Sequence, residues 1–179
     1  MHPGSQSIGL AAVAFALGAG LMDLRWRRIP NWWTLPGLLV GLLLNACIAG
    51  WQGTKSSLLG ALLGLAVLLP FVFVRSLGAG DWKLVGALGA FLGPSRLWQL
   101  LIGSIFVAGL MALVLVIWNR RLGETLKNIG HMLASFFTLR LPGPAVSLDN
   151  PKSARVPFGV AVALAMALYE ATGFRWGVF

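Results

Sequence analysis

Acidic residues are scarce in this chain. It has five Asp and Glu side chains against 14 Lys and Arg, which gives a formal net charge of +9 over 179 residues. Of the five acids, Asp23 and Asp81 lie where an apolar run meets a basic, glycine-rich turn. A carboxylate against hydrocarbon costs about 2.5–3.5 kcal/mol on insertion scales, so an acid at such a boundary is a candidate functional group. We therefore predict that Asp23 and Asp81 form a functional pair.

Charged residues of both signs are rare as well. They make up 11% of the chain, hydrophobic residues make up 58%, and the mean hydropathy is +0.82. This balance excludes an ordinary soluble domain and indicates an integral membrane protein. The basic residues lie between apolar runs and form no single stripe with interleaved aromatics, so they do not indicate nucleic-acid binding. Membrane lipid is the expected partner.

Cysteine and histidine are nearly absent. Cys47 is the single cysteine and lies within an apolar run, so it can form neither an internal disulfide nor a thiolate metal cluster. The two histidines are isolated, and the sequence shows no cluster with the spacing of a zinc site. We therefore expect no metal and no cofactor.

The long apolar runs predict the fold class. About 20 apolar residues cross a bilayer as a helix, and lipid permits only helices or closed barrels as spanning structures. We predict an all-α integral membrane protein, a bundle of about six transmembrane helices of which one is short. The expected spans are Ile8–Leu24, Trp33–Ala49, Ser57–Val74, the short Trp82–Leu92, Leu97–Trp118 and Val156–Thr172. Pairs of small residues predict close helix packing at Gly37–Gly41, Gly60–Gly64 and Gly86–Gly89.

The distribution of Lys and Arg predicts the orientation in the membrane. With six alternating spans, eleven basic residues fall on one side and three on the other, namely Lys55, Arg96 and Arg175. Cytoplasmic loops carry the excess of Lys and Arg. The rich side is therefore predicted to be cytoplasmic, with both termini outside and with Asp23 and Asp81 at the cytoplasmic face.

One long connection interrupts the spans. We treat residues 1–179 as a single membrane-embedded domain in which residues 119–155 form a cytoplasmic loop. Apolar residues recur there at helical spacing, which predicts an amphipathic helix in the membrane interface: Leu126, Ile129, Leu133, Phe136 and Phe137. This helix could close the bundle or dock a membrane-bound substrate.

The segment around Asp81 has the residues of a backbone-binding turn. Asp81 follows Gly78-Ala79-Gly80 and is predicted to be the N-cap of the short helix. Without a Cβ, Gly78 and Gly80 could let a substrate backbone approach the acid. Lys83 could neutralise the acid pair or bind a lipid phosphate. A purely structural N-cap is the alternative for Asp81.

Asp23 closes the first span. Downstream, Pro30 is expected to stop that helix and Asn31 to cap the next one. Taken alone, Asp23 could simply pair with the neighbouring arginines. Two carboxylates on one face could instead share a proton, so that one activates water and the other polarises a carbonyl, as in aspartyl proteases. Because a helix N-terminus favours an anion, we predict Asp81 to be the resting base.

Together these residues resemble the type IV prepilin peptidase family of GxGD aspartyl proteases. The resemblance lies in Asp23 followed by Arg28-Ile29-Pro30-Asn31, in Gly78–Leu84 leading into Gly86–Gly93, and in Val156–Ala161, which is similar to the family's final-helix motif. It implies an inner-membrane peptidase that cleaves prepilins at the cytoplasmic face, with Asp23 and Asp81 as catalytic residues. It further implies supporting roles for Pro157 and Gly159.

The chain also departs from the long members of that family. Those members carry a large early cytoplasmic insertion, often with zinc-binding cysteine pairs, and they also methylate the new pilin N-terminus. This sequence has neither feature and is similar to the short form of tight-adherence (Flp) pilus systems, so methylation is not expected. Trp82 stands where the family more often has a small aliphatic residue.

Other readings stay open at this point. A related enzyme could act on archaeal preflagellin or another intramembrane target. A noncatalytic assembly protein could use the acids only to pair with arginines. A small transporter would need polar groups near mid-membrane, where the spans offer little beyond Asn45 and Ser104. The oligomeric state is not predicted.

Overall fold

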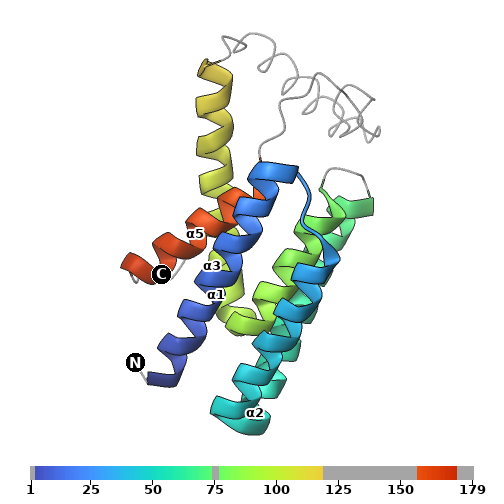
Figure 1. Cartoon of the computed structure of the whole chain (residues 1–179), viewed down its shortest axis with the longest axis vertical. Helices are drawn as coiled ribbons and strands as arrows, with labels where there is room; N and C mark the ends of the chain where they lie inside the picture. Colours follow the sequence, from blue (N-terminus) through green and yellow to red (C-terminus); the bar gives the residue numbers. More distant parts are fainter. Residues whose placement is uncertain (1–2, 74–76, 119–156, 173–179) are drawn as a thin grey trace, which may run out of the picture. The chain divides into compact units, whose positions relative to one another are not determined.

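The computed structural model describes residues 3–73, 77–118 and 157–172, and all regular structure in these ranges is helical. Figure 1 shows the four helices: α1 (Pro3–Trp26), α2 (Asn31–Phe73), α3 (Ala79–Trp118) and α5 (Phe158–Thr172). The chain divides into two units, residues 1–108 with 157–179 and residues 109–156. All contacts described below belong to the first unit. The predicted amphipathic loop at 119–155 lies outside the described residues.

Two of the helices are too long for a single membrane crossing. The 43 residues of α2 and the 40 of α3 would each extend roughly 60 Å, about twice the thickness of a hydrocarbon core. Gly50 (φ 56°) interrupts α2 and Gly93 (φ 71°) interrupts α3 with left-handed backbone that favours glycine. These breaks lie directly after the predicted span ends at Ala49 and Leu92.

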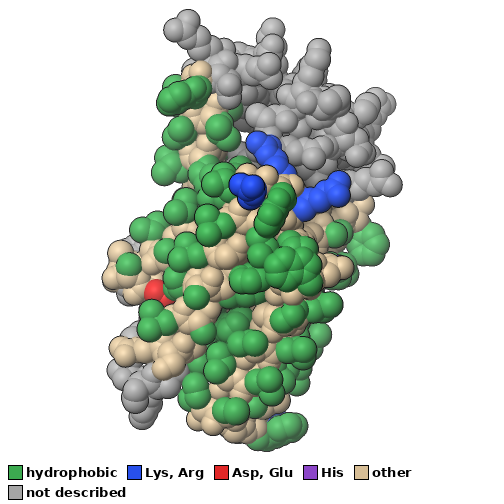
Figure 2. Space-filling model, viewed as in Figure 1, with side chains coloured by type: hydrophobic (Ala, Val, Ile, Leu, Met, Phe, Trp, Pro, Cys, Tyr) green, Lys and Arg blue, Asp and Glu red, His purple; other side chains and the backbone are tan. Residues whose placement is uncertain are grey.

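Length and composition agree with a membrane protein. Within the described residues, α1, α2 and α3 are long and apolar enough to cross a membrane, and α5 is a shorter apolar helix. The all-helical, membrane-type prediction is confirmed at this level. In Figure 2 most of the visible described surface is apolar, while Lys and Arg gather where α1 ends. Large side chains such as Leu21, Leu62 and Trp51 are more than 60% exposed, as expected for a surface that faces lipid.

Close packing of small residues joins α2 to α3. A Cβ on Gly60 would overlap the main chain of Gly89, and a Cβ on Gly89 would overlap that of Gly60. A Cβ on Gly64 would lie 2.8 Å from the Val85 carbonyl oxygen. The predicted packing role of these glycines is confirmed. Every residue from Leu84 to Gly93 is buried, so the short first half of α3 forms the centre of the unit.

Side chains from α2 replace a hydrogen bond that α3 cannot make. Pro94 has no N–H, so it cannot donate to the carbonyl of Ala90 one turn earlier. Asn45 Nδ2 donates to this oxygen at 2.9 Å and Ser57 Oγ at 2.7 Å. Asn45 Nδ2 also lies 3.0 Å from the Phe91 carbonyl oxygen. Asn45, one of the few polar residues within the spans, therefore has a structural role.

Candidate active site

Asp23 lies in the last turn of α1 and is only 7% exposed. The helix ends at Trp26, and Arg27 adopts a left-handed conformation (φ 53°) while its N–H donates to the Asp23 carbonyl at 2.8 Å. The predicted stop at Pro30 is therefore wrong by a few residues. The left-handed residue ends the helix first, as in a C-terminal αL cap.

The side chain of Asp23 contacts the beginning of α5. The main-chain N–H of Gly159 donates to Asp23 Oδ2 at 2.8 Å. The N–H of Val160 also hydrogen-bonds this carboxylate. Pro157 and Gly159, predicted as supporting residues, thus lie at the turn that holds Asp23.

Asp81 lies in the first turn of α3. Because the Gly78 carbonyl accepts the first helical bond, from Trp82 N at 3.2 Å, Gly78 is the N-cap and Asp81 is the third helical residue. The prediction of Asp81 as the N-cap is therefore wrong. Its side chain turns back to the main chain of Gly78 and hydrogen-bonds it. This is one half of a capping box, with aspartate in place of glutamate, because Gly78 has no side chain for the reciprocal bond.

Gly80 lies against the turn between α1 and α2. A Cβ on Gly80 would lie 3.1 Å from the Ile29 carbonyl oxygen and 3.3 Å from the Ile29 Cβ. The missing side chain therefore lets the Asp81 segment pack directly on the segment that follows Asp23. This contact brings the two acidic segments together.

The two aspartates line one pocket of about 270 Å³. Its other lining residues are Arg27, Arg28, Ile29, Gly78, Ala79 and Gly80. The two carboxylates are close enough to interact electrostatically. The structure thus brings together the predicted acid pair and both glycines. Arg27 and Arg28 were missed as pocket residues, although their position just after Asp23 could have indicated them.

Lys83 and Asn31 meet at the start of α2. Lys83 Nζ donates to Asn31 Oδ1 at 2.9 Å in an exposed position. The Pro30 carbonyl accepts from the N–H of Trp33 at 3.1 Å, which makes Pro30 the N-cap of α2 and Asn31 its first residue. Asn31 therefore does not hold the predicted cap position. Lys83, Asn31 and Pro30 are not among the residues that line the pocket.

Trp82 ties the Asp81 segment to α2. Its Nε1 donates to the Leu65 carbonyl at 2.7 Å. The indole therefore holds the beginning of α3 in place while its ring remains half-buried.

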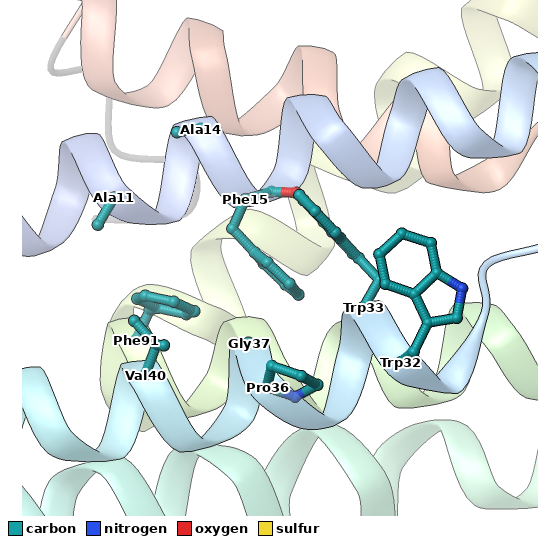
Figure 3. Close-up of a pocket in the computed structure, with 9 residues that line it drawn as sticks. All are labelled: Ala11, Ala14, Phe15, Trp32, Trp33, Pro36, Gly37, Val40 and Phe91. Carbon is teal, nitrogen blue, oxygen red and sulfur yellow. The ribbon is translucent and has the colours of Figure 1, made fainter.

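Two other pockets contain no acid or base. One is a groove of about 410 Å³ between α1 and α2, lined by Phe15, Trp32, Trp33, Pro36 and Phe91 among others (Figure 3). Phe15 and Trp33 stack there with ring centroids 5.8 Å apart. The second pocket, near Leu77 and Phe158, is also apolar. Acid–base chemistry is thus confined, among these three pockets, to the one with Asp23 and Asp81.

The pocket with Asp23 and Asp81 provides two carboxylates as potential metal ligands. In the ranges that the structure describes, no three His, Cys, Asp or Glu side chains are grouped so that they could hold a metal ion. Two carboxylates in one pocket can divide the roles of acid and base in a hydrolysis.

Comparison with known proteins identifies the family. Residues 10–117 match the model of the type IV leader peptidase family (Peptidase A24). A prepilin leader peptidase/N-methyltransferase of Neisseria gonorrhoeae is 36% identical over 119 residues, which cover 63% of this chain and 40% of that protein. The enzyme of the same description from Klebsiella pneumoniae is 32% identical over 116 residues, 60% of this chain and 49% of that protein.

No solved structure matches the chain. The alignments span less than half the length of these relatives. The family model nevertheless covers more than half of the chain, including Asp23 and Asp81. This chain belongs to the type IV leader peptidase family, whose members are aspartic-type prepilin peptidases.

Proposed function

We propose that this chain is a prepilin leader peptidase that removes the leader peptide of type IV or Flp-type prepilins at the cytoplasmic face of the inner membrane. The pocket shared by Asp23 and Asp81 carries the proposal, because it lies within the segment that the family model matches. The names of the similar proteins provide the substrate class.

In the proposed reaction Asp23 and Asp81 share one proton, since two like charges in one pocket do not ionise together easily. The ionised carboxylate takes a proton from water while the water oxygen attacks the scissile carbonyl carbon. The protonated carboxyl gives its proton to the carbonyl oxygen, which yields a gem-diol. When the C–N bond breaks, the amine takes a proton from one carboxyl and a diol hydroxyl returns one to the other.

The arginines in the pocket suit this chemistry. Arg27 and Arg28 line the same cavity as the two carboxylates. Their positive charges lower the cost of keeping an anion in apolar surroundings. We assign them an electrostatic supporting role.

The membrane arrangement is part of the proposal. The breaks at Gly50 and Gly93 divide α2 and α3 into two segments each, which with α1 and α5 gives six spans. In this arrangement both chain ends lie outside and the pocket faces the cytoplasm. The exposed positions Arg25 and Gln52 test it, after the exposed Cys47 is replaced by serine. A cysteine at 25 should be labelled from the cytoplasmic side and one at 52 from the outside; the reverse would contradict the orientation.

We also propose cleavage without N-methylation. The connection between α1 and α2 has only four residues, Arg27–Pro30, and the chain has one cysteine. The chain thus has neither the long early loop nor the cysteine pair expected of the long, methylating form. A methyl group on the product, dependent on an added methyl donor, would contradict this part of the proposal.

The purified full chain, incubated with a full-length Flp-type prepilin in lipid vesicles, tests the proposed function. Mass spectrometry of the products reports both the cleaved bond and any methyl group. We expect one cut, between a basic leader and the apolar stem. An intact prepilin under conditions in which a known family member cleaves it would contradict the proposal.

A further inference from the structure

We infer that the side chain of Asp23 caps the N-terminus of α5 from outside that helix and that this contact positions the carboxylate for catalysis. The inference rests on the proposed function of Asp23. It makes Gly159 a positioning residue that acts through its main-chain N–H. The family model ends at residue 117, before α5 begins, so the match itself assigns no role to this helix.

The beginning of α5 has no capping side chain of its own. The Pro157 carbonyl accepts from the N–H groups of Val160 (3.2 Å) and Ala161 (3.3 Å), which places Pro157 at the N-cap. An N-cap side chain normally accepts from the second or third helical N–H, and proline has no oxygen with which to do so. The second and third N–H groups of α5 are those of Gly159 and Val160, and the side chain of Asp23 accepts from both. An acid from α1 thus replaces the missing local cap.

Position 159 leaves no room for a side chain. A Cβ there would lie 2.9 Å from Asp23 Oδ2, 3.0 Å from Asp23 Cβ and 3.1 Å from Ile29 Cδ1. A larger residue would therefore push the carboxylate away from the helix end. Glycine is needed at this position because of the close approach and not because of an unusual backbone conformation.

The contact also distinguishes the two oxygens of Asp23. Oδ2 accepts a hydrogen bond from Gly159, so it is the oxygen directed away from proton exchange. Oδ1 is then the oxygen that takes or gives the proton in the reaction. Anions at a helix N-terminus are stabilised by its N–H groups, so this contact favours the ionised form of Asp23, as the N-terminus of α3 favours that of Asp81.

Serine at position 157 provides the sharpest test. In Pro157→Ser a local hydroxyl competes with Asp23 for the N–H groups of α5, whereas Pro157→Ala removes the ring without adding an oxygen. We expect Pro157→Ser to have a melting temperature at least equal to that of Pro157→Ala but a kcat several-fold lower, with KM within about twofold. A merely structural cap would move stability and activity in the same direction. Equal kcat values for the two variants would overturn the inference.

A methyl group at position 159 tests the same contact from the other side. Gly159→Ala should lower kcat on the order of 10- to 100-fold, as expected for a misplaced catalytic group. Ile29→Val added to Gly159→Ala should restore part of the loss, because it removes the Cδ1 methyl that confines the new Cβ. Met166→Ala is the packing control, since Met166 is fully buried about two turns along α5.

The outcomes separate this inference from the proposed function. Wild-type kcat in Gly159→Ala, or a loss no larger than that of Met166→Ala at equal thermal destabilisation, would overturn the positioning role. If Gly159→Ala does not fold, the comparison of Ser and Ala at 157 decides. Asp23→Asn is measured in the same assay: if it is active, the dyad itself is wrong, and if it is inactive while the 157 and 159 variants are unaffected, only the positioning role is wrong.

Discussion

The pocket around Asp23 and Asp81 and the kinked region around Gly93 both hold polar atoms in apolar surroundings, but in opposite ways. At the kink, the side chains of Asn45 and Ser57 donate to the Ala90 carbonyl, which lies in the last turn before the break at Gly93 and Pro94. At the pocket, main-chain N–H groups hold the side chain of Asp23. Side chains complete the backbone in one region, and the backbone orients a side chain in the other.

Substitutions in the two regions should therefore affect different properties of the protein. The side chains of Asn45 and Ser57 at the kink donate hydrogen bonds within the protein, so changes there should affect stability. In the proposed reaction the carboxylates in the pocket exchange protons, so changes there should affect turnover. The following predictions test this division, beginning with the largest expected effect.

Removing either carboxylate should abolish activity without unfolding the protein. Asp23→Asn and Asp81→Asn should each lower kcat by at least about 100-fold, because an acid–base pair fails when one member cannot exchange its proton. Glu170→Gln is the matched control, as Glu170 lies in α5 against Gly9 of α1 and outside the pocket. Prepilin cleavage at wild-type rates by either aspartate variant would end the dyad proposal.

Filling the contact between α2 and α3 should cost stability but little turnover. A Cβ on Gly89 overlaps the main chain of Gly60, so Gly89→Ala should destabilise the fold by about 1–3 kcal/mol. Gly109→Ala is the control, because a Cβ there would meet no described atom within 4 Å. Thermal unfolding in detergent measures the effect. A stable Gly89→Ala protein with impaired kcat would break the proposed division of roles.

Removing the polar support of the kink should have a smaller effect. Asn45→Ala should cost about 0.6–1.7 kcal/mol, the range of hydrogen bonds between membrane helices. Ser57 donates to the same carbonyl oxygen, so Asn45→Ala should cost more in a Ser57→Ala background, where no other side chain supports that oxygen. Equal costs in both backgrounds would show that the two side chains do not support the Ala90 carbonyl together.

Chelation should have no measurable effect on cleavage. The described part of the chain has no group of three metal-ligating residues, and the proposed reaction uses only the two carboxylates. Initial rates with and without EDTA provide the measurement. Loss of activity in EDTA and its recovery with zinc would contradict an aspartyl mechanism.

The sequence was a good guide to the helices and to the acid pair. Apolar length marked the spans, and the polar turns after Ala49 and Leu92 marked the breaks, because glycine, proline and charged residues interrupt the apolar pattern there. Pairing of Asp23 with Asp81 followed from their exceptional position at the ends of apolar runs. Both features depend on side-chain chemistry that can be read from one local segment.

The details of the pocket were harder to predict. The hydrogen bond from Gly159 to Asp23 comes from a main-chain N–H, which leaves no signal in residue type and joins positions 136 apart. The place of Asp81 within its helix was missed because Gly78, a residue without a side chain, provides the cap. Arg27 and Arg28 were interpreted as topology signals and as possible partners of Asp23, and not as residues that line the pocket.

The turns at Gly50 and Gly93 have a consequence for proteolysis. At each of them the chain passes from one helical segment to the next with a single non-helical residue. A protease must draw an extended stretch of substrate into its active site, so it can cut there only after local unfolding. Limited digestion of the folded protein should therefore leave the bonds around Gly50 and Gly93 uncut, even when the protease has free access to both turns.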